Sequence, residues 1–446
     1  MNKYKVEKSI EYNKRLKKTL PGGIHYNMRT PWKETPVHFT MGKDSRLWDM
    51  DGNEYLDLSA KFGSMILGHT NTRFNEYMKF WFDKVLSVNH CEIDADVCEY
   101  FVKHFPSIDM IRYGLSGTEI VQNALRLARA HTGKNRFVRF EGHFHGSADN
   151  ILGGKVTNRE YPVPTDRDQK NITTAGRALD ALEGQSFMLP WNDFEALESL
   201  VADYADEIAA IITEPYCING GGVMPLPGYL EKMRELCDLN NIVLIFDEVI
   251  TGMRVGLGGA QKELGVTPDL TTLGKAISGC GIPVSALGGK KEIMELYEKR
   301  AVLHAGTYNG YVLGAAAIKA TFDIFEDGER DYYADAGKKA NRLYDVFKEC
   351  ARDVGLPLVI QGPPLCATYH CHPEVIRRYD ELTDDIILKD IIINNSLASY
   401  GILVTTISRM YPNITLSDDD IDFFEDRIEV ALLNAKESIK MMSDAG

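Results

Sequence analysis

Residues 242–247 read Ile-Val-Leu-Ile-Phe-Asp, five apolar residues followed by one carboxylate. A run this short and this apolar predicts a strand buried on both faces, as in a parallel sheet. Similar runs recur, with helical periodicity between most of them, for example at 118–132 and 227–239. This alternation predicts an α/β fold in which helices flank a mainly parallel sheet, with strands at 110–113, 136–140, 208–213, 242–246, 270–273 and 285–288.

The two ends of the chain predict a second, smaller α+β domain. Near the N-terminus, an amphipathic helix over 5–18 precedes a small antiparallel sheet with a hairpin at Asp51-Gly52. The C-terminal part predicts helices, a few strands and a closing helix near 418–441. The polar residues 153–181 form a long loop, which we interpret as a lid, with disorder as the alternative. The expected divisions are residues 1–71, 72–328 and 329–446.

The bulk composition limits the partners and the location of the protein. The 446 residues carry a net charge of -14, which argues against polyanionic partners such as nucleic acid or an anionic membrane. There is no signal-peptide pattern and no run of roughly 20 apolar residues. Because the eight cysteines are scattered, we expect no disulfide framework and a cytoplasmic protein. Cys366, His370, Cys371 and His372 lie close together, but we interpret them as strand residues rather than metal ligands.

Three strand ends carry chemically active residues, and ligands of open α/β sheets bind at the carboxyl ends of strands. Asp247 follows an apolar strand, where a carboxylate requires a positive partner such as a pyridinium N–H, or else caps the next helix. Lys275 follows 270–273 between small residues, which suits a lysine that forms an imine, although most lysines lie on the surface.

The third strand end is the turn Ser116-Gly117-Thr118, which opens a long helix. Its N–H groups, hydroxyls and helix dipole suit a phosphate, although in isolation a plain helix cap is the commoner explanation. Each signal is weak alone. Together they match the phosphate, the pyridinium nitrogen and the aldehyde of pyridoxal 5'-phosphate (PLP), which we therefore predict as the cofactor.

The chain resembles the class III (ω-amino-acid type) aminotransferases of PLP fold type I. Within that family it is most similar to the glutamate-1-semialdehyde aminomutase branch. The resemblance runs from about Leu20 to near the C-terminus. It is carried by LPGGIHYNMR, DMDGNEYLDL, SGTE, FEGHFHG, EPYCINGG, IFDEVITGMR, LGKAISGCGIPVSALGG and HAGTYNG.

The resemblance implies a role for each matching position. Lys275 matches the Schiff-base lysine that also moves a proton, and Asp247 matches the partner of the ring nitrogen. Phe144 and Val249 match residues on opposite faces of the cofactor ring. The remaining implied cofactor residues are the phosphate turn Ser116, Gly117 and Thr118, the polar residues Glu214 and Asn219, and Thr307, which in the family reaches the phosphate of the neighbouring subunit. A homodimer with shared active sites is therefore implied.

Substrate residues are also implied. Arg29 matches a carboxylate-binding arginine, with a surface arginine as the alternative, and Phe62 matches an aromatic wall. The segment 407–416 departs from the aminomutases and is more similar to the arginine-then-proline segment of ornithine- and aminobutyrate-type transaminases. Arg409 is therefore a second candidate for binding a carboxylate.

The predicted activity is an aminotransferase that moves an amino group between a carboxylate-bearing amino compound and an oxo acid or aldehyde. The alternative is a glutamate-1-semialdehyde-type 2,1-aminomutase, and more distant alternatives are an epimerase and a non-catalytic PLP-fold protein. A nicotinamide-dependent dehydrogenase is set aside, because Gly256-Leu257-Gly258-Gly259 does not follow a strand in the required register.

Overall fold

The computed structural model describes residues 2–26, 37–85, 88, 90–153 and 185–445. These residues form two compact units. Unit 1 combines both ends of the chain, residues 1–75, 327–376 and 380–446, and unit 2 holds residues 76–326 and 377–379. The predicted lid and Arg29 lie outside the described residues, apart from Gly153.

Unit 2 is built on a seven-stranded sheet with the order β4-β10-β9-β8-β7-β5-β6. The strands β9, β8, β7, β5 and β6 are parallel to one another, whereas β10 is antiparallel to both β4 and β9. The prediction of a mainly parallel sheet is confirmed, with one antiparallel strand that the apolar pattern did not reveal. The strands are β4 (Met110–Gly114), β5 (Arg136–Phe140), β6 (Ser186–Leu189), β7 (Ile208–Thr213), β8 (Val243–Glu248), β9 (Leu270–Leu273) and β10 (Ser285–Gly289).

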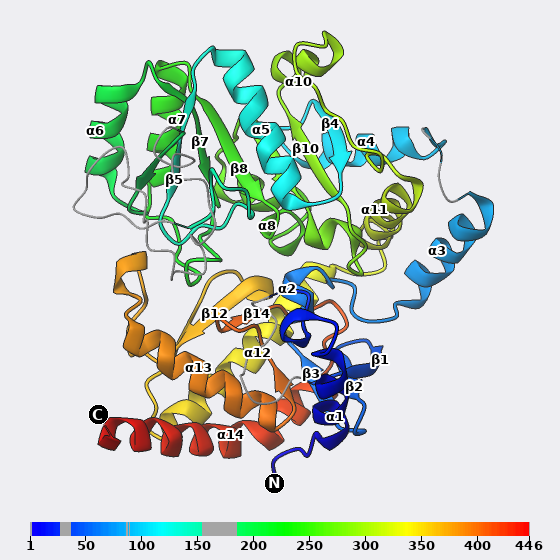
Figure 1. Cartoon of the computed structure of the whole chain (residues 1–446), viewed down its shortest axis with the longest axis vertical. Coiled ribbons are helices and arrows are strands. Elements are labelled where there is room, and N and C mark those ends of the chain that lie inside the picture. Colours follow the sequence, from blue (N-terminus) through cyan, green and yellow to red (C-terminus); the bar gives the residue numbers. More distant parts are fainter. Residues whose placement is uncertain (1, 27–36, 86–87, 89, 154–184, 446) are drawn as a thin grey trace. The chain divides into compact units, whose positions relative to one another are not determined.

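Helices line this sheet (Figure 1), and α5 packs along β7, β8, β9 and β10 through its apolar stripe. Both ends of α5 are capped: the Ser116 Oγ accepts the N–H of Glu119, and Gly133 closes the helix in the left-handed conformation. The helices are α3 (Thr72–Lys84, from unit 1 into unit 2), α4 (Asp94–His104), α5 (Gly117–Thr132), α6 (Phe194–Tyr204), α7 (Tyr229–Leu239), α8 (Thr251–Arg254), α9 (Gly259–Leu264), α10 (Lys291–Glu298) and α11 (Val312–Phe325).

Unit 1 joins segments far apart in the sequence. Strand β13 pairs in parallel with β3, and the predicted hairpin at Asp51-Gly52 is confirmed by the antiparallel pair β2 and β3. A second sheet has the order β11-β12-β14. The elements are α1 (Glu7–Leu16), β1 (Phe39–Lys43), β2 (Arg46–Asp49), β3 (Glu54–Asp57), α2 (Ala60–Gly63), α12 (Tyr332–Asp353), β11 (Val359–Gln361), β12 (Ala367–His370), α13 (Asp384–Ser399), β13 (Ile402–Leu403), β14 (Arg409–Met410) and α14 (Asp418–Ala445).

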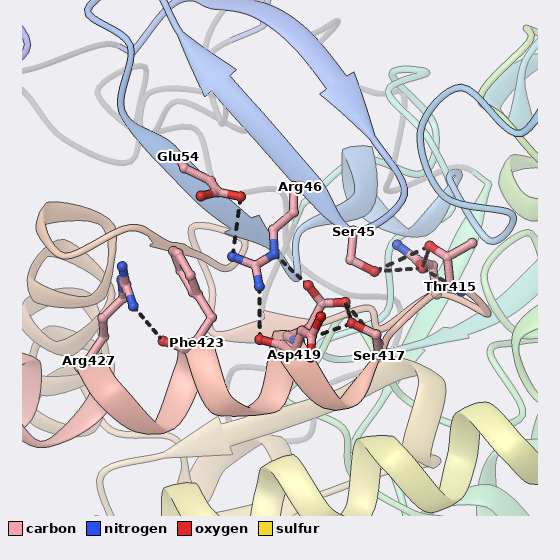
Figure 2. A network of polar contacts seen from close by, with 10 residues as sticks. Ser45, Arg46, Glu54, Thr415, Ser417, Asp419, Phe423 and Arg427 are labelled. Carbon is pink, nitrogen blue, oxygen red and sulfur yellow. Dashed lines mark hydrogen bonds and ion pairs between the residues drawn. The ribbon is translucent and has the colours of Figure 1, made fainter.

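Arg46 ties the N-terminal sheet to the C-terminal helix α14 (Figure 2). Its Nε donates to the Oδ1 of Asp420 over 2.5 Å, and its Nη2 donates to the Asp419 carbonyl over 3.1 Å. Its guanidinium lies 3.8 Å from the centre of the Phe423 ring, which Arg427 also approaches at 3.4 Å. A partly buried cation with three kinds of partner holds the sheet against the start of α14.

The prediction that the clustered Cys and His residues of the C-terminal part lie in a strand is correct for His370 only, since Cys371 and His372 follow the end of β12. His370 lies at the end of β12 and its Nδ1 is 2.8 Å from the Oδ2 of Asp390, whereas Cys366 ends the preceding helical turn. Among the described residues, no group of three or more His, Cys, Asp or Glu side chains is arranged to hold a metal ion. Within the same residues, no helix is both long enough and apolar enough to cross a membrane.

Candidate active site

Asp247 lies within β8, one residue before the strand ends, and its side chain is buried. The prediction that the strand ends at Phe246 is wrong: β8 continues through Glu248, because residues 247 and 248 pair with Thr272 and Leu273 of β9. The Oδ1 of Asp247 accepts the Thr272 hydroxyl and the Val249 N–H, each over 3.1 Å. A buried carboxylate in a sheet core requires such donors, and these also fix its orientation.

His145 completes the surroundings of Asp247. Its Nδ1 is 2.7 Å from the Oδ2 of Asp247, and both side chains are buried. An ionised carboxylate can only accept, so the Nδ1 carries the proton in this hydrogen bond. The sequence analysis missed His145, although it lies in the quoted motif FEGHFHG. The motif contains two histidines, and nothing in the sequence indicates which of them meets a carboxylate about 100 positions later.

Lys275 follows β9 with a strained backbone. It has a φ of +46°, which side-chain-bearing residues rarely adopt, and it starts a short 3₁₀ turn over Lys275–Ser278. The Ser278 hydroxyl donates to the Lys275 carbonyl over 3.1 Å and stabilises this turn. The preceding Gly274 faces the Val249 side chain, which lies 3.3 Å from where a Cβ at position 274 would be. The lysine is therefore held by a defined turn rather than by a mobile surface loop.

The predicted phosphate turn forms the N-terminus of α5. A Cβ at Gly117 would meet only the Val249 methyl groups, at 3.4 and 3.5 Å, so Val249 lies beside both the phosphate turn and the lysine turn. The Thr118 Oγ1 accepts the N–H of Ser147 over 3.2 Å, which joins the helix start to the loop after β5. The arrangement presents the first N–H groups of a 16-residue helix, with the positive end of its dipole, at the carboxyl edge of the sheet.

Phe144, Glu214 and Asn219 form one polar cluster. The Oε1 of Glu214 accepts the Phe144 N–H and the Asn219 side-chain amide, each over 2.8 Å, and its Oε2 accepts the Asn219 N–H over 3.1 Å. Burial raises the pKa of Glu214 above its usual value. The neighbouring His143 accepts the Glu214 N–H over 3.0 Å, and burial lowers its pKa well below the usual value, so it remains a neutral acceptor.

These residues fit PLP by the chemistry of their groups. Among the described residues, the buried Nε2 of His145 has no hydrogen-bond partner, and a Cβ at Gly117 would contact only the Val249 side chain. Asp247 can hold a protonated ring nitrogen, and the start of α5 can hold a phosphate. Lys275 supplies the amine. Glu214, itself bonded to Asn219, fixes the backbone of Phe144, and this residue is 42% exposed, so that its ring can stack on a cofactor.

The other predicted residues lie elsewhere in the chain. Thr307 is exposed in the segment before α11. Phe62 lies in unit 1 in a left-handed turn in which Ala60, Lys61 and Phe62 all have φ between +40° and +56°. The Oδ1 of Asp57 accepts both the Ser59 and Ala60 N–H groups over 3.0 Å and so stabilises this turn. Arg409 is buried in β14 of the same unit.

A mainly parallel α/β sheet with a lysine, a carboxylate and a phosphate turn at its edge defines a PLP-dependent enzyme. The family model described as "Aminotransferase class-III" matches residues 28–432. The chain therefore belongs to the class-III aminotransferase family. Family and fold together confirm the predicted family resemblance, PLP fold type I and PLP as the cofactor.

Individual relatives and structures extend this result. The chain is 36% identical to a glutamate-1-semialdehyde 2,1-aminomutase from Methanosarcina acetivorans, over 80% of this chain and 82% of the relative. It is 38% identical to the protein of the same name from Chlorobium phaeobacteroides, over 79% and 80% of the two chains. Among solved structures, an omega-transaminase from Sphaerobacter thermophilus matches with a TM-score of 0.88 and 28% identity, over 96% of this chain and 98% of the other.

Proposed function

We propose that the enzyme moves an amino group within one carboxylate-bearing amino aldehyde, as a glutamate-1-semialdehyde-type 2,1-aminomutase does. The single observation that carries this proposal is the match to aminomutases at 36% and 38% identity over about four-fifths of the chain. It favours the alternative of the sequence analysis over the main prediction of an intermolecular aminotransferase. The substrate would be glutamate-1-semialdehyde, and the product its isomer with the amine on carbon 1 and the oxo group on carbon 2.

Several residues of the chain have separate roles in this reaction. When bound, PLP supplies an aldehyde that condenses with amines and a ring that withdraws electrons from the amine-bearing carbon. Lys275 would hold the aldehyde form of the cofactor covalently, and its free amine would move the proton on the substrate carbon. Asp247 would accept the hydrogen bond of the protonated ring nitrogen. Ser116, Gly117 and Thr118 bind the phosphate, and Phe144 and Val249 orient the ring from its two faces.

Arg409 is our first candidate for binding the substrate carboxylate. Its segment is similar to the arginine-then-proline segment of ornithine- and aminobutyrate-type transaminases, in which the arginine pairs with a substrate carboxylate. Phe62, in its strained turn, would then form an aromatic wall on one side of the substrate. Arg29 remains the second candidate for the carboxylate and lies outside the described residues.

Intermolecular transamination is the second candidate function. It is favoured by the segment Arg409-Met410-Tyr411-Pro412, which departs from the aminomutase pattern. The same residues would act, but the oxo product would leave and a separate oxo acid or aldehyde would take the amine. The two functions differ in whether a second substrate is required.

A turnover test separates them. We would add glutamate-1-semialdehyde to the purified enzyme in its pyridoxamine phosphate form, without any acceptor, and follow both the aldehyde and the amino ketone. We expect stoichiometric isomer formation in wild type, and at least a 1000-fold loss of turnover in Lys275→Ala, since removing a residue that does the chemistry costs about this much or more. Release of an oxo acid only when an acceptor is added would instead establish the transaminase, and an active Lys275→Ala would refute the assignment of the lysine.

We also propose a cytoplasmic homodimer in which Thr307 of one subunit reaches the phosphate bound by the other. The exposure of the 305–308 segment leaves it accessible to a second copy. Sedimentation velocity checks the dimer: a single species near 50 kDa, the mass of one chain, at micromolar concentration would refute it.

A further inference from the structure

Arg409 is preceded by a tight and strained turn. The Thr405 N–H donates to the Arg409 carbonyl over 3.1 Å, and the Arg409 N–H donates to the Thr405 Oγ1 over 3.0 Å. Between them, the buried Ser408 has a φ of +59°. A serine is strained in this left-handed conformation, because its Cβ lies too close to the following carbonyl oxygen. The turn therefore needs outside contacts to keep this shape.

Asn394 of helix α13 supplies these contacts. Its side-chain amide donates to the Ser408 Oγ over 3.2 Å and to the Thr406 carbonyl over 3.3 Å. Its Oδ1 accepts the Tyr369 hydroxyl from β12, and the Tyr369 N–H donates to the Ser408 carbonyl over 3.2 Å. Asn394 is fully buried, and its Oδ1 and amide together engage three residues. The turn is thus clamped from a helix and a strand at once.

We infer that Asn394 is a positioning residue that selects carboxylate-bearing substrates by fixing the direction of Arg409. The inference rests on the proposed function, in which Arg409 binds the substrate carboxylate. A guanidinium pairs with a carboxylate through two parallel hydrogen bonds, so small changes in its direction weaken the pair. Without the contacts of Asn394, Ser408 relaxes toward negative φ. This rotation changes the direction in which the Arg409 side chain leaves the backbone.

The matched test compares Asn394→Leu with Asn395→Leu on the holoenzyme. Asn395 is the next residue of the same helix and is only partly buried, with its side chain outside this network. The two probes are glutamate-1-semialdehyde and 2-aminobutanal, which lacks only the carboxyl group. For Asn394→Leu we expect the KM for glutamate-1-semialdehyde to rise about tenfold, equivalent to one buried hydrogen-bonding contact, with kcat changed less than about threefold. The KM for 2-aminobutanal and all constants of Asn395→Leu should stay at the wild-type values.

Two further variants make the test specific for positioning. Tyr369→Phe removes only the hydroxyl and should raise the same KM about threefold, which keeps the test available if Asn394→Leu fails to fold. Adding Ser408→Gly to Asn394→Leu should restore the KM to within about threefold of wild type, because glycine adopts the left-handed conformation without strain. A purely structural loss of stability would not be reversed in this way.

Arg409→Gln separates the inference from the function on which it rests. If Arg409→Gln leaves the KM for glutamate-1-semialdehyde unchanged, the carboxylate role of Arg409 is refuted and the inference falls with it. If Arg409→Gln raises that KM but Asn394→Leu and Tyr369→Phe match Asn395→Leu, the proposed function stands and the positioning role is refuted. The positioning role is also refuted, and the proposed function stands, if Asn394→Leu raises the KM for glutamate-1-semialdehyde and for 2-aminobutanal equally.

Discussion

At the scale of single residues, the contact between His145 and Asp247 carries a specific expectation. Removing a hydrogen bond to a charged group costs about 1.5–3 kcal/mol, so His145→Ala should weaken PLP affinity roughly 10- to 100-fold. His145→Asn should recover part of this loss, since its amide can replace the Nδ1 donor. Equilibrium dialysis measures the affinity, with the exposed His131→Ala on α5 as the control. Equal affinities of His145→Ala and His131→Ala would show that the contact has no influence on the cofactor.

The residues of the site were predictable to different degrees. Lys275 and the Ser116–Thr118 turn follow apolar strands, and Asp247 follows the apolar residues of β8 within that strand, so their places near the carboxyl ends of the strands could be predicted from position alone. His145 could not, because its role arises from a 2.7 Å contact between β8 and the loop after β5. The left-handed conformations of Lys275 and Ser408 were equally hidden, since neither residue type favours positive φ.

At the scale of elements, the close approach of Gly146 to α5 leads to the next prediction. A Cβ at Gly146 would lie 2.6 Å from the Thr118 Oγ1 and 2.8 Å from the Thr118 Cα, whereas a Cβ at Gly133, at the other end of α5, would meet nothing within 4 Å. Both glycines have positive φ. Gly133→Ala should therefore lose about 1 kcal/mol of stability, and Gly146→Ala a further 1–3 kcal/mol with weaker PLP binding, because the start of α5 must move.

Chemical denaturation and a PLP titration of the two variants check this expectation. Gly133→Ala is the matched control, since it carries the backbone strain without the collision. Unchanged PLP affinity in Gly146→Ala would mean that the loop, and not the helix start, moves to admit the methyl group. The phosphate turn would then be less tightly coupled to the loop after β5 than the 3.2 Å contact of Thr118 indicates.

Six of the seven strands in the sheet of unit 2 were predicted, but β6 was missed and the direction of β10 was not predicted. The link from β9 to β10 covers residues 274–284 and contains only a short 3₁₀ turn. A parallel connection requires a crossover of a dozen or more residues, usually a helix, so this link returns β10 antiparallel. The length of this link was therefore the feature of the sequence that indicated the direction of β10. The apolar pattern could not indicate the direction, because a buried strand has the same pattern whether it runs parallel or antiparallel to its neighbours.

At the scale of the whole molecule, the proposed cofactor residues all lie in unit 2, although the chain's two ends meet in unit 1. A ligand that binds only the folded state stabilises it by about 2.7 kcal/mol at 100 times its Kd. Local openings that break cofactor contacts should be suppressed by the same amount. PLP should therefore slow amide hydrogen exchange most in β8, in β9 and at the start of α5.

Hydrogen exchange with and without PLP, read by mass spectrometry, tests this expectation. Peptides covering α13 and the β12 strand of unit 1 serve as the internal reference. Lys275→Ala should show a smaller gain in protection, because it holds PLP without the covalent bond. A uniform gain across both units would mean that unit 2 opens only when the entire chain unfolds. In that case PLP alone, without substrate, would also stabilise unit 1. The strained turns at Phe62 and Ser408 would then be maintained by the folding of the entire chain rather than by their local contacts.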